Sequence, residues 1–132
     1  MKDYICALIG GLGTVIVYMF GGLDVAMQCL LIAIALDYVS GLIKAFSLKV
    51  LSSKIGFRGL LKKIGVLVLV MLAVLIDRVT GESGAIRTLV IYYFVANEGL
   101  SIIENLGEAG LPIPKVIKNA LKALRDQGNG KK

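Results

Sequence analysis

The sequence predicts an all-α integral membrane protein with about four transmembrane helices, the first and third short, and a C-terminal amphipathic helix. Of the 132 residues, 57% are apolar and only 18% are charged. A soluble domain of this size leaves too much surface exposed to hide so many apolar side chains. The apolar residues also gather into long runs, as bilayer-spanning helices require. A soluble fold is therefore excluded.

Four apolar segments are candidate spans: 5–20, 25–46, 64–76 and 86–106. A helix needs about 20 residues to cross about 30 Å of hydrocarbon. The second and fourth segments meet this length alone. The first and third would need flanking residues or a locally thinner bilayer to cross.

Basic residues in the connections predict the orientation. The segment 47–63 holds Lys49, Lys54, Arg58, Lys62 and Lys63 without an acid, and the tail after residue 106 is also rich in lysine. The positive-inside rule places both on the cytoplasmic side, together with the N-terminus if the first segment crosses. The chain then divides into a transmembrane domain, 1–106, with a cytoplasmic basic loop, 47–63, and a basic cytoplasmic tail, 107–132.

The tail is predicted to form an amphipathic helix after Pro112 and Pro114. One face would carry Val116, Ile117, Ala120, Leu121 and Leu124, and the rest would carry Lys115, Lys118, Lys122 and Arg125. Such a helix suits an anionic membrane surface. We therefore expect these cations, with Lys62 and Lys63, to contact anionic lipids. Packing on a neighbouring subunit is the alternative, and residues 127–132 are expected to fray.

Polar residues interrupt two of the spans. Asp37, Ser40, Gly41 and Lys44 share one helical face, and Asn97, Glu98 and Ser101 lie in the fourth span at a similar depth. These residues predict a polar membrane seam used for oligomerisation. Ser40, Asn97 and Ser101 could instead only join helices. An ionised carboxylate costs about 2.5–3.5 kcal/mol at the bilayer centre, so Asp37 and Glu98 favour a functional role.

Other residue classes narrow the function. Gly10, Gly13 and Thr14 predict close helix packing in the first span. Cys6 and Cys29 lie in apolar runs and are interpreted as packing residues. With no histidine, metal-ligand cluster, phosphate loop or nucleophile–base pair, we expect no enzyme, metal or cofactor. The basic patch has no accompanying nucleic-acid fold, so nucleic acid is not an expected partner.

Two motifs carry a family resemblance. The first is Leu36-Asp37-Tyr38-Val39-Ser40-Gly41, and the second is Leu51-Ser52-Ser53-Lys54-Ile55-Gly56-Phe57-Arg58-Gly59. Together they resemble the D-Y-x-[ST]-G and S-S-K-x-G-x-x-G elements of the phage-lysis and toxin-secretion holin family of Gram-positive bacteria and their phages. The resemblance covers most of the chain. It carries over to Asp37, Tyr38, Ser40, Gly41, Ser52, Ser53, Lys54, Gly56 and Gly59 as motif positions.

The resemblance implies a protein that oligomerises in the bacterial cytoplasmic membrane and opens a timed lesion for host cell lysis. Its partners would be copies of itself, a lipid bilayer with anionic lipids, and an endolysin or toxin as released cargo; whether an antiholin exists stays open. Two alternatives stay open. The chain could be an antiholin that regulates a holin, or a small four-helix transporter with Asp37 or Glu98 as a proton-coupled site.

Overall fold

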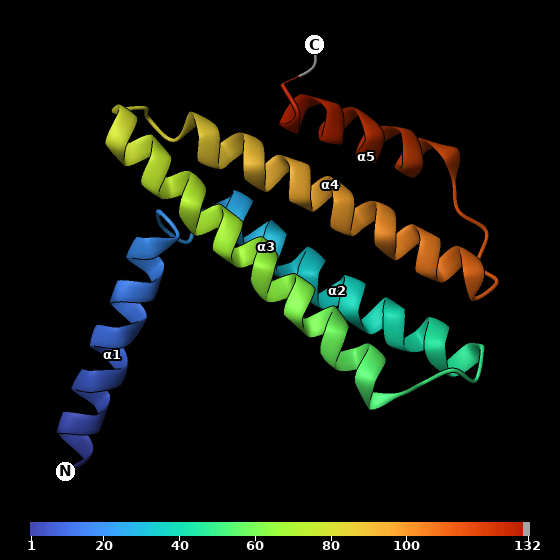
Figure 1. Cartoon of the computed structure of the whole chain (residues 1–132), viewed down its shortest axis with the longest axis horizontal. Coiled ribbons are helices and arrows are strands. Elements are labelled where there is room, and N and C mark those ends of the chain that lie inside the picture. The colour runs from blue at the N-terminus through green and yellow to red at the C-terminus, as the bar shows by residue number, and fades with distance from the viewer. Residues whose placement is uncertain (131–132) are drawn as a thin grey trace.

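The computed structural model describes residues 1–130, which form five helices and no strand. Figure 1 shows them in chain order as α1 (Lys2–Met19), α2 (Val25–Ser47), α3 (Ser53–Thr80), α4 (Ala85–Glu108) and α5 (Lys115–Gly128). The first four are long and apolar enough to cross a membrane. The predicted fold class, four candidate spans followed by a fifth helix, is therefore confirmed.

The third span is longer than its apolar run suggested. α3 has 28 residues and begins at Ser53, so most of the basic segment expected as the loop 47–63 is helical. The Ser52 hydroxyl accepts a hydrogen bond from the Ile55 amide at 3.3 Å and caps the helix. The connection between α2 and α3 shrinks to residues 48–52. The basic residues supply the helical length that the apolar run 64–76 lacks.

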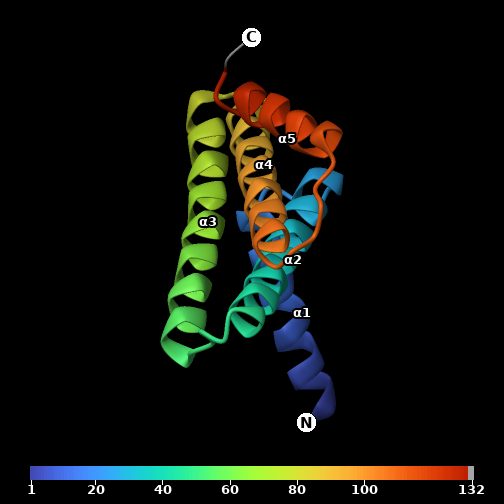
Figure 2. The ribbon, with the colours of Figure 1, turned by 90° about the vertical axis from the view of Figure 1, so that its right-hand side faces the viewer.

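The helix α4 lies at the centre of the bundle. It packs against α2, α3 and α5, whereas α2 and α3 touch each other less (Figure 2). A small apolar core joins α2, α3 and α4. It consists of Met27, Leu30, Val66, Val70 and Ile91. The opposite faces of α2 and α3 expose large apolar side chains, as expected of surfaces in contact with lipid.

The helix α1 leaves the bundle and has no buried residue (Figure 1). A Cβ added at Gly10 or Gly13 would meet no other atom within 4 Å. The Thr14 hydroxyl donates to the Gly10 carbonyl within the same helix at 2.8 Å. The close packing expected of these small residues is thus not made inside the described chain, and packing against another molecule stays a prediction.

The C-terminal helix begins after the predicted proline break and turns back along α4 (Figure 1). Leu121 and Leu124 of its apolar face are half-buried, while Val116 and Ile117 are exposed. The helix continues through Gln127 and Gly128, where fraying was expected. Asn129 and Gly130 form a turn after the helix, and residues 131 and 132 lie outside the described residues.

The turn between α3 and α4 is fixed by a buried acid. The Asp77 carboxylate accepts hydrogen bonds from the backbone amides of Ile86 at 3.0 Å and Arg87 at 2.8 Å. These amides lie in the first turn of α4, where no carbonyl of the helix can satisfy them. Gly81 ends α3 in the left-handed conformation, with φ of 74°. Asp77 therefore sets where α4 starts.

Replacing Asp77 tests this cap. Asp77→Ala leaves two amides without their acceptor, so we expect the free energy of unfolding to fall by about 1–2 kcal/mol. Denaturant titration in detergent micelles, followed by far-ultraviolet circular dichroism, measures the change. Glu82→Ala, at an exposed residue of the same turn, is the control. Equal stability of the two variants would contradict the capping role.

Candidate functional site

A lysine joins two acids inside the bundle. The Lys63 ammonium of α3 forms salt bridges with Asp37 of α2 and Glu98 of α4. Because both carboxylates contact Lys63 Nζ, Asp37 and Glu98 lie at the same depth in the bundle, in the interior of their spans. The side chain of Lys63 is only 14% exposed, and those of Asp37 and Glu98 are each 8% exposed. We call Asp37, Lys63 and Glu98 the charge cluster.

Two neutral polar groups extend the charge cluster toward the α2–α3 connection. The Asn105 amide donates to Asp37 Oδ1 at 3.2 Å and to Ser40 Oγ at 3.0 Å. The Ser40 hydroxyl donates to the Asp37 backbone carbonyl at 2.9 Å. No buried side-chain nitrogen or oxygen among residues 1–130 is left without a partner. The sequence thus supplies full hydrogen bonding to groups that hydrocarbon cannot solvate.

The charge cluster has an uneven charge. When all three groups are ionised, two negative charges face one positive charge, which leaves one negative charge in excess. Bringing ions out of water costs several kcal/mol each, and attraction offsets this only with good geometry. The charge cluster is therefore stable while the helices hold it closed, and any opening that admits water would lower the energy of the excess charge.

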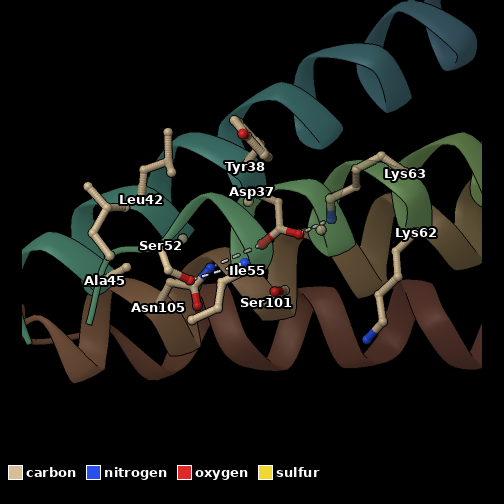
Figure 3. Close-up of a pocket in the computed structure, with 14 residues that line it drawn as sticks. Asp37, Tyr38, Leu42, Ala45, Ser52, Ile55, Lys62, Lys63, Ser101 and Asn105 are labelled. Atoms are coloured by element: carbon tan, nitrogen blue, oxygen red, sulfur yellow. Dashed lines mark hydrogen bonds and ion pairs between the residues drawn. The ribbon is translucent and has the colours of Figure 1, made fainter.

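A cavity of about 200 Å³ reaches the charge cluster from the α2–α3 connection (Figure 3). Asp37, Lys63 and Asn105 lie at its inner end, while Leu42, Ala45 and Ile55 form apolar walls. Ser101 of α4 also lines it. Water entering here would reach Asp37 without crossing the apolar core of the bundle.

The two motifs converge on this cavity. Tyr38 and Gly41 of the first motif and Ser52, Gly56 and Gly59 of the second all line it. A Cβ at Gly56 would lie 3.3 Å from the Tyr38 hydroxyl, so the missing side chain lets the ring sit against α3. A Cβ at Gly41 would lie 3.7 Å from the Asn105 amide nitrogen. The motif residues therefore shape the cavity and the approach of Asn105 to Asp37.

A second polar group closes the other end of the bundle. The buried Arg87 guanidinium holds Asp24 with two hydrogen bonds, of 2.8 and 3.0 Å. It also donates to the backbone carbonyls of Phe20 at 2.6 Å and Gly22 at 3.0 Å. A Cβ at Gly21 would lie 2.9 Å from Arg87 Nε, so only glycine fits there. We call Arg87 and Asp24 the clamp. The clamp fixes the turn between α1 and α2, from which α1 leaves the bundle.

The exit of α1 has one further contact. The Arg78 guanidinium of α3 donates to the Tyr18 carbonyl at 2.6 Å and lies 3.9 Å from the centre of the Tyr18 ring. Such a cation–π contact adds about 0.5–1 kcal/mol at an exposed site. Together with the clamp, it holds the C-terminal end of α1 against the α3–α4 end of the bundle.

The structure brings only part of the predicted seam together. Asp37, Ser40 and Glu98 meet, Gly41 and Ser101 line the cavity, and Asn97 lines a second cavity beside the charge cluster. Lys44 lies apart, where it pairs with Glu108 at 2.7 Å at the end of the bundle. Ser53 and Lys54 are exposed in the first turn of α3, beside the cap.

The expectation for Lys63 was wrong. Lys63 was expected to contact anionic lipid, but its ammonium turns inward to the two acids. The reason is that two carboxylates in apolar spans need a cation, and Lys63 is the first residue before the apolar part of α3. Lys62, Lys115, Lys118 and Lys122 are exposed and Arg125 is half-exposed, so their contact with anionic lipid stays a prediction.

Asn105 was missed because the predicted stripe on the fourth span was rotated. The residue spacing puts Tyr93, Asn97, Ser101 and Glu104 on one stripe with Glu98 adjacent to it, whereas the face that meets the charge cluster follows Glu98, Ser101 and Asn105. These spacings of three and four residues are equally helical. Starting from the acid that most needs a partner would have found the correct face.

Comparison with known proteins decides the family. The model of the bacteriophage holin family matches residues 14–126. The chain belongs to the bacteriophage holin family. It is similar to a probable holin of Bacillus phage phi105, with 32% identity over 114 residues that cover 86% of this chain and 84% of the relative. No solved structure matches it.

Cellular relatives of this holin-family chain are also similar over almost their full length. An uncharacterized protein of Clostridium perfringens strain 13 is 43% identical over 120 residues, covering 89% of this chain and 88% of the relative. A 14.9 kDa protein encoded in the nagH 3′ region of the same species is 42% identical over 126 residues, covering 95% and 96%. Membership and the apolar helices make the chain a multi-pass membrane protein with a holin role.

Removing the shared cation tests the charge cluster. Lys63→Met leaves Asp37 and Glu98 facing each other without a counter-ion, so we expect a loss of about 3–5 kcal/mol in stability in micelles. Lys62→Met, at the exposed neighbour, is the matched control. Adding Asp37→Asn and Glu98→Gln to Lys63→Met should recover part of the loss. A Lys63→Met protein as stable as the control would refute the charge cluster.

The clamp predicts a pH dependence. The hydrogen bonds from Arg87 to Asp24 lower the pKa of this carboxyl below its usual 3.8, outweighing the opposing effect of burial. Since the folded-state pKa lies below the unfolded value, the contribution to stability is fully present above the unfolded pKa. It is lost as the pH falls through the folded pKa. Thermal unfolding of Asp24→Asn and the parent protein should differ at neutral pH and converge in acid; a constant difference would contradict the clamp.

Proposed function

We propose that this chain is a holin that assembles with its own copies in the bacterial cytoplasmic membrane and opens a timed lesion. The lesion releases an endolysin, or a toxin, and so leads to host cell lysis. The observation that carries this proposal is a buried cluster of two acids and one cation, enclosed by helices whose outer faces are apolar. The similarity to a probable holin supports it.

The trigger we propose is a cooperative change in helix packing that wets the charge cluster. In the resting membrane, Lys63 and Asn105 satisfy the acids and the cluster stays dry. As protomers accumulate, contacts between them replace contacts within each bundle, and the cavity beside Asp37 admits water. A difference of about 1.4 kcal/mol changes the ratio of two packings tenfold, so a small shift in contacts is enough.

The proposed orientation puts the N- and C-termini in the cytoplasm. Lys49 of the α2–α3 connection, Lys54 and Arg58 of the first turns of α3, and the start of α5 would then lie on that side, in accord with the positive-inside rule. We propose that Lys62 and the cations of α5 contact anionic headgroups before the lesion opens. Gly10, Gly13 and Thr14 on the free helix α1 are the proposed surface for contact with another copy.

Induced expression with and without a co-expressed endolysin tests the function. A holin should give a silent delay, then abrupt depolarisation, and lysis only when endolysin is present. An uncoupler should trigger it early. Gradual leakage despite confirmed membrane insertion would favour a transporter instead. Delay of another holin's lysis would identify an antiholin.

Asp37→Asn tests the proposed trigger. The substitution removes the excess negative charge but keeps the shape of the side chain, so the closed packing should become more favourable. We expect later lysis at matched expression, with the delay measured as culture density and membrane potential against time. Asp3→Asn, which changes an exposed acid of α1 in the same way, is the control. Unchanged timing of Asp37→Asn would remove the charge cluster from the trigger.

A further inference from the structure

The C-terminal helix lies directly on the backbone of α4. A Cβ at Gly99 would lie 2.6 Å from Leu121 Cδ2, so Leu121 fills the space that a side chain there would occupy. A Cβ at Gly128 would lie 2.5 Å from the Tyr93 backbone nitrogen. The helix makes no comparable contact with α1, α2 or α3 in the described chain. Docking of α5 is therefore a specific fit to one face of α4.

The docked helix reaches deep into the membrane-spanning region. Gly99 and Tyr93 lie 9 and 15 residues before Glu108, the end of α4 (108 − 99 and 108 − 93). At 1.5 Å per residue these are distances of about 14 and 22 Å along the helix axis. The hydrocarbon layer is about 30 Å thick. With Glu108 taken as the edge of the hydrocarbon layer, the C-terminal end of α5 lies more than halfway across it, beside a helix long enough to span.

The outward face of α5 is unsuited to lipid at that depth. Lys115, Lys118 and Lys122 are exposed, and α5 contributes to none of the salt bridges among the described residues. Lys122, next to Leu121 at about 14 Å from the end of α4, lies near the middle of the hydrocarbon layer, where a cation costs about 2.5–3.5 kcal/mol, whereas Lys115 and Lys118 lie nearer its edge. While α5 is docked and α4 spans the membrane, this face must therefore meet water.

The rest of the protomer has the opposite character. The helices α1, α2 and α3 expose many large apolar side chains, whereas on α4 only Leu89 is a comparably exposed large hydrophobic residue, at 38%. The apolar residues of α4 are covered by α2 and α3 on one part and by α5 on another. One side of the protomer is apolar and suits lipid, whereas the other is cationic and requires water. Such a protomer could form the wall of a pore, with lipid on one side and water on the other.

We infer that the docked α4–α5 pair lines the lumen of the open lesion, with the basic face of α5 in contact with water. The apolar faces of α1, α2 and α3 then meet lipid or neighbouring copies. This inference rests on the proposed function and assigns the surface that faces the released cargo.

A reversible cross-link between α4 and α5 tests the inference. Gly99→Cys and Leu121→Cys bring two thiols together, in a background where Cys6→Ala and Cys29→Ala remove the native thiols. The missing leucine branches leave room for the bridge. The purified protein is oxidised, checked on a non-reducing gel to exclude links between molecules, and reconstituted into anionic vesicles that hold a fluorescent dextran. We expect the oxidised protein to release dextran to the same extent as the reduced protein.

The outcomes separate two failures. Dextran release only after addition of a reductant would mean that α5 must leave α4, and would overturn the inference while the proposed function stands. No release from either form, together with no release from the parent protein, would overturn the proposed function and this inference with it. Leu121→Cys alone, oxidised in the same way, is the control for effects of the substitution.

A spin label on the polar face of α5 gives an independent measurement. In release-competent vesicles, a nitroxide at Asn119→Cys should collide with a water-soluble nickel chelate more often than with oxygen. A nitroxide at Leu72→Cys, on the exposed apolar face of α3, should show the reverse. Preference of the Asn119 label for oxygen would place α5 in lipid and contradict the inference.

Discussion

The ion pairs from Lys63 to Asp37 and Glu98 hold three helices at a common level. In a low-dielectric surrounding, two buried carboxylates require a cation between them, and Lys63 supplies it. A shift of α2, α3 or α4 along its axis by one turn, about 5.4 Å, would break at least one of the pairs. The register of the bundle, the position of Asn105 and the inner end of the cavity all follow from this one contact.

The two ends of the bundle are built differently. At the end where α1 leaves, Arg87 and Asp77 satisfy both turns with hydrogen bonds to backbone groups, so that end is closed. At the other end, Lys44 and Glu108 form a partly exposed ion pair, and the cavity opens beside it. Exposed ion pairs contribute little, about 0–1 kcal/mol. The bundle is thus firm at one end and loose at the end that gives access to the charge cluster.

Much of the fold could be predicted from the sequence because hydropathy in a membrane protein is a strong signal. Helix number, the break at Pro112 and Pro114, and the level of Asp37 and Glu98 followed from apolar runs and residue spacing. The start of α3 did not follow, because its first turns are basic and an apolar run alone cannot mark them. The Ser52 cap and the absence of proline were the available signals for the longer helix.

Only the two acids of the candidate site could be predicted from the sequence, for a different reason. The two acids stand out in apolar spans, but their partner is chosen by tertiary packing. Lys63 looks like any other lysine of a basic segment until α3 is placed between α2 and α4. Likewise nothing in the sequence pairs Arg87 with Asp24, since 63 residues separate them. Long-range pairs of this kind depend on which helices are neighbours in the bundle. A single sequence does not show which helices pack together.

The fit between Gly21 and Arg87 links two distant positions in the history of the family. Any side chain at position 21 would collide with the guanidinium, and φ of 74° there also disfavours other residues. A relative that has lost the arginine is released from the steric limit, whereas one that keeps it must keep the glycine. Relatives that have arginine at position 87 should therefore also have glycine at position 21. Their joint presence in a sequence would mark those members whose first helix leaves the bundle in this fixed direction.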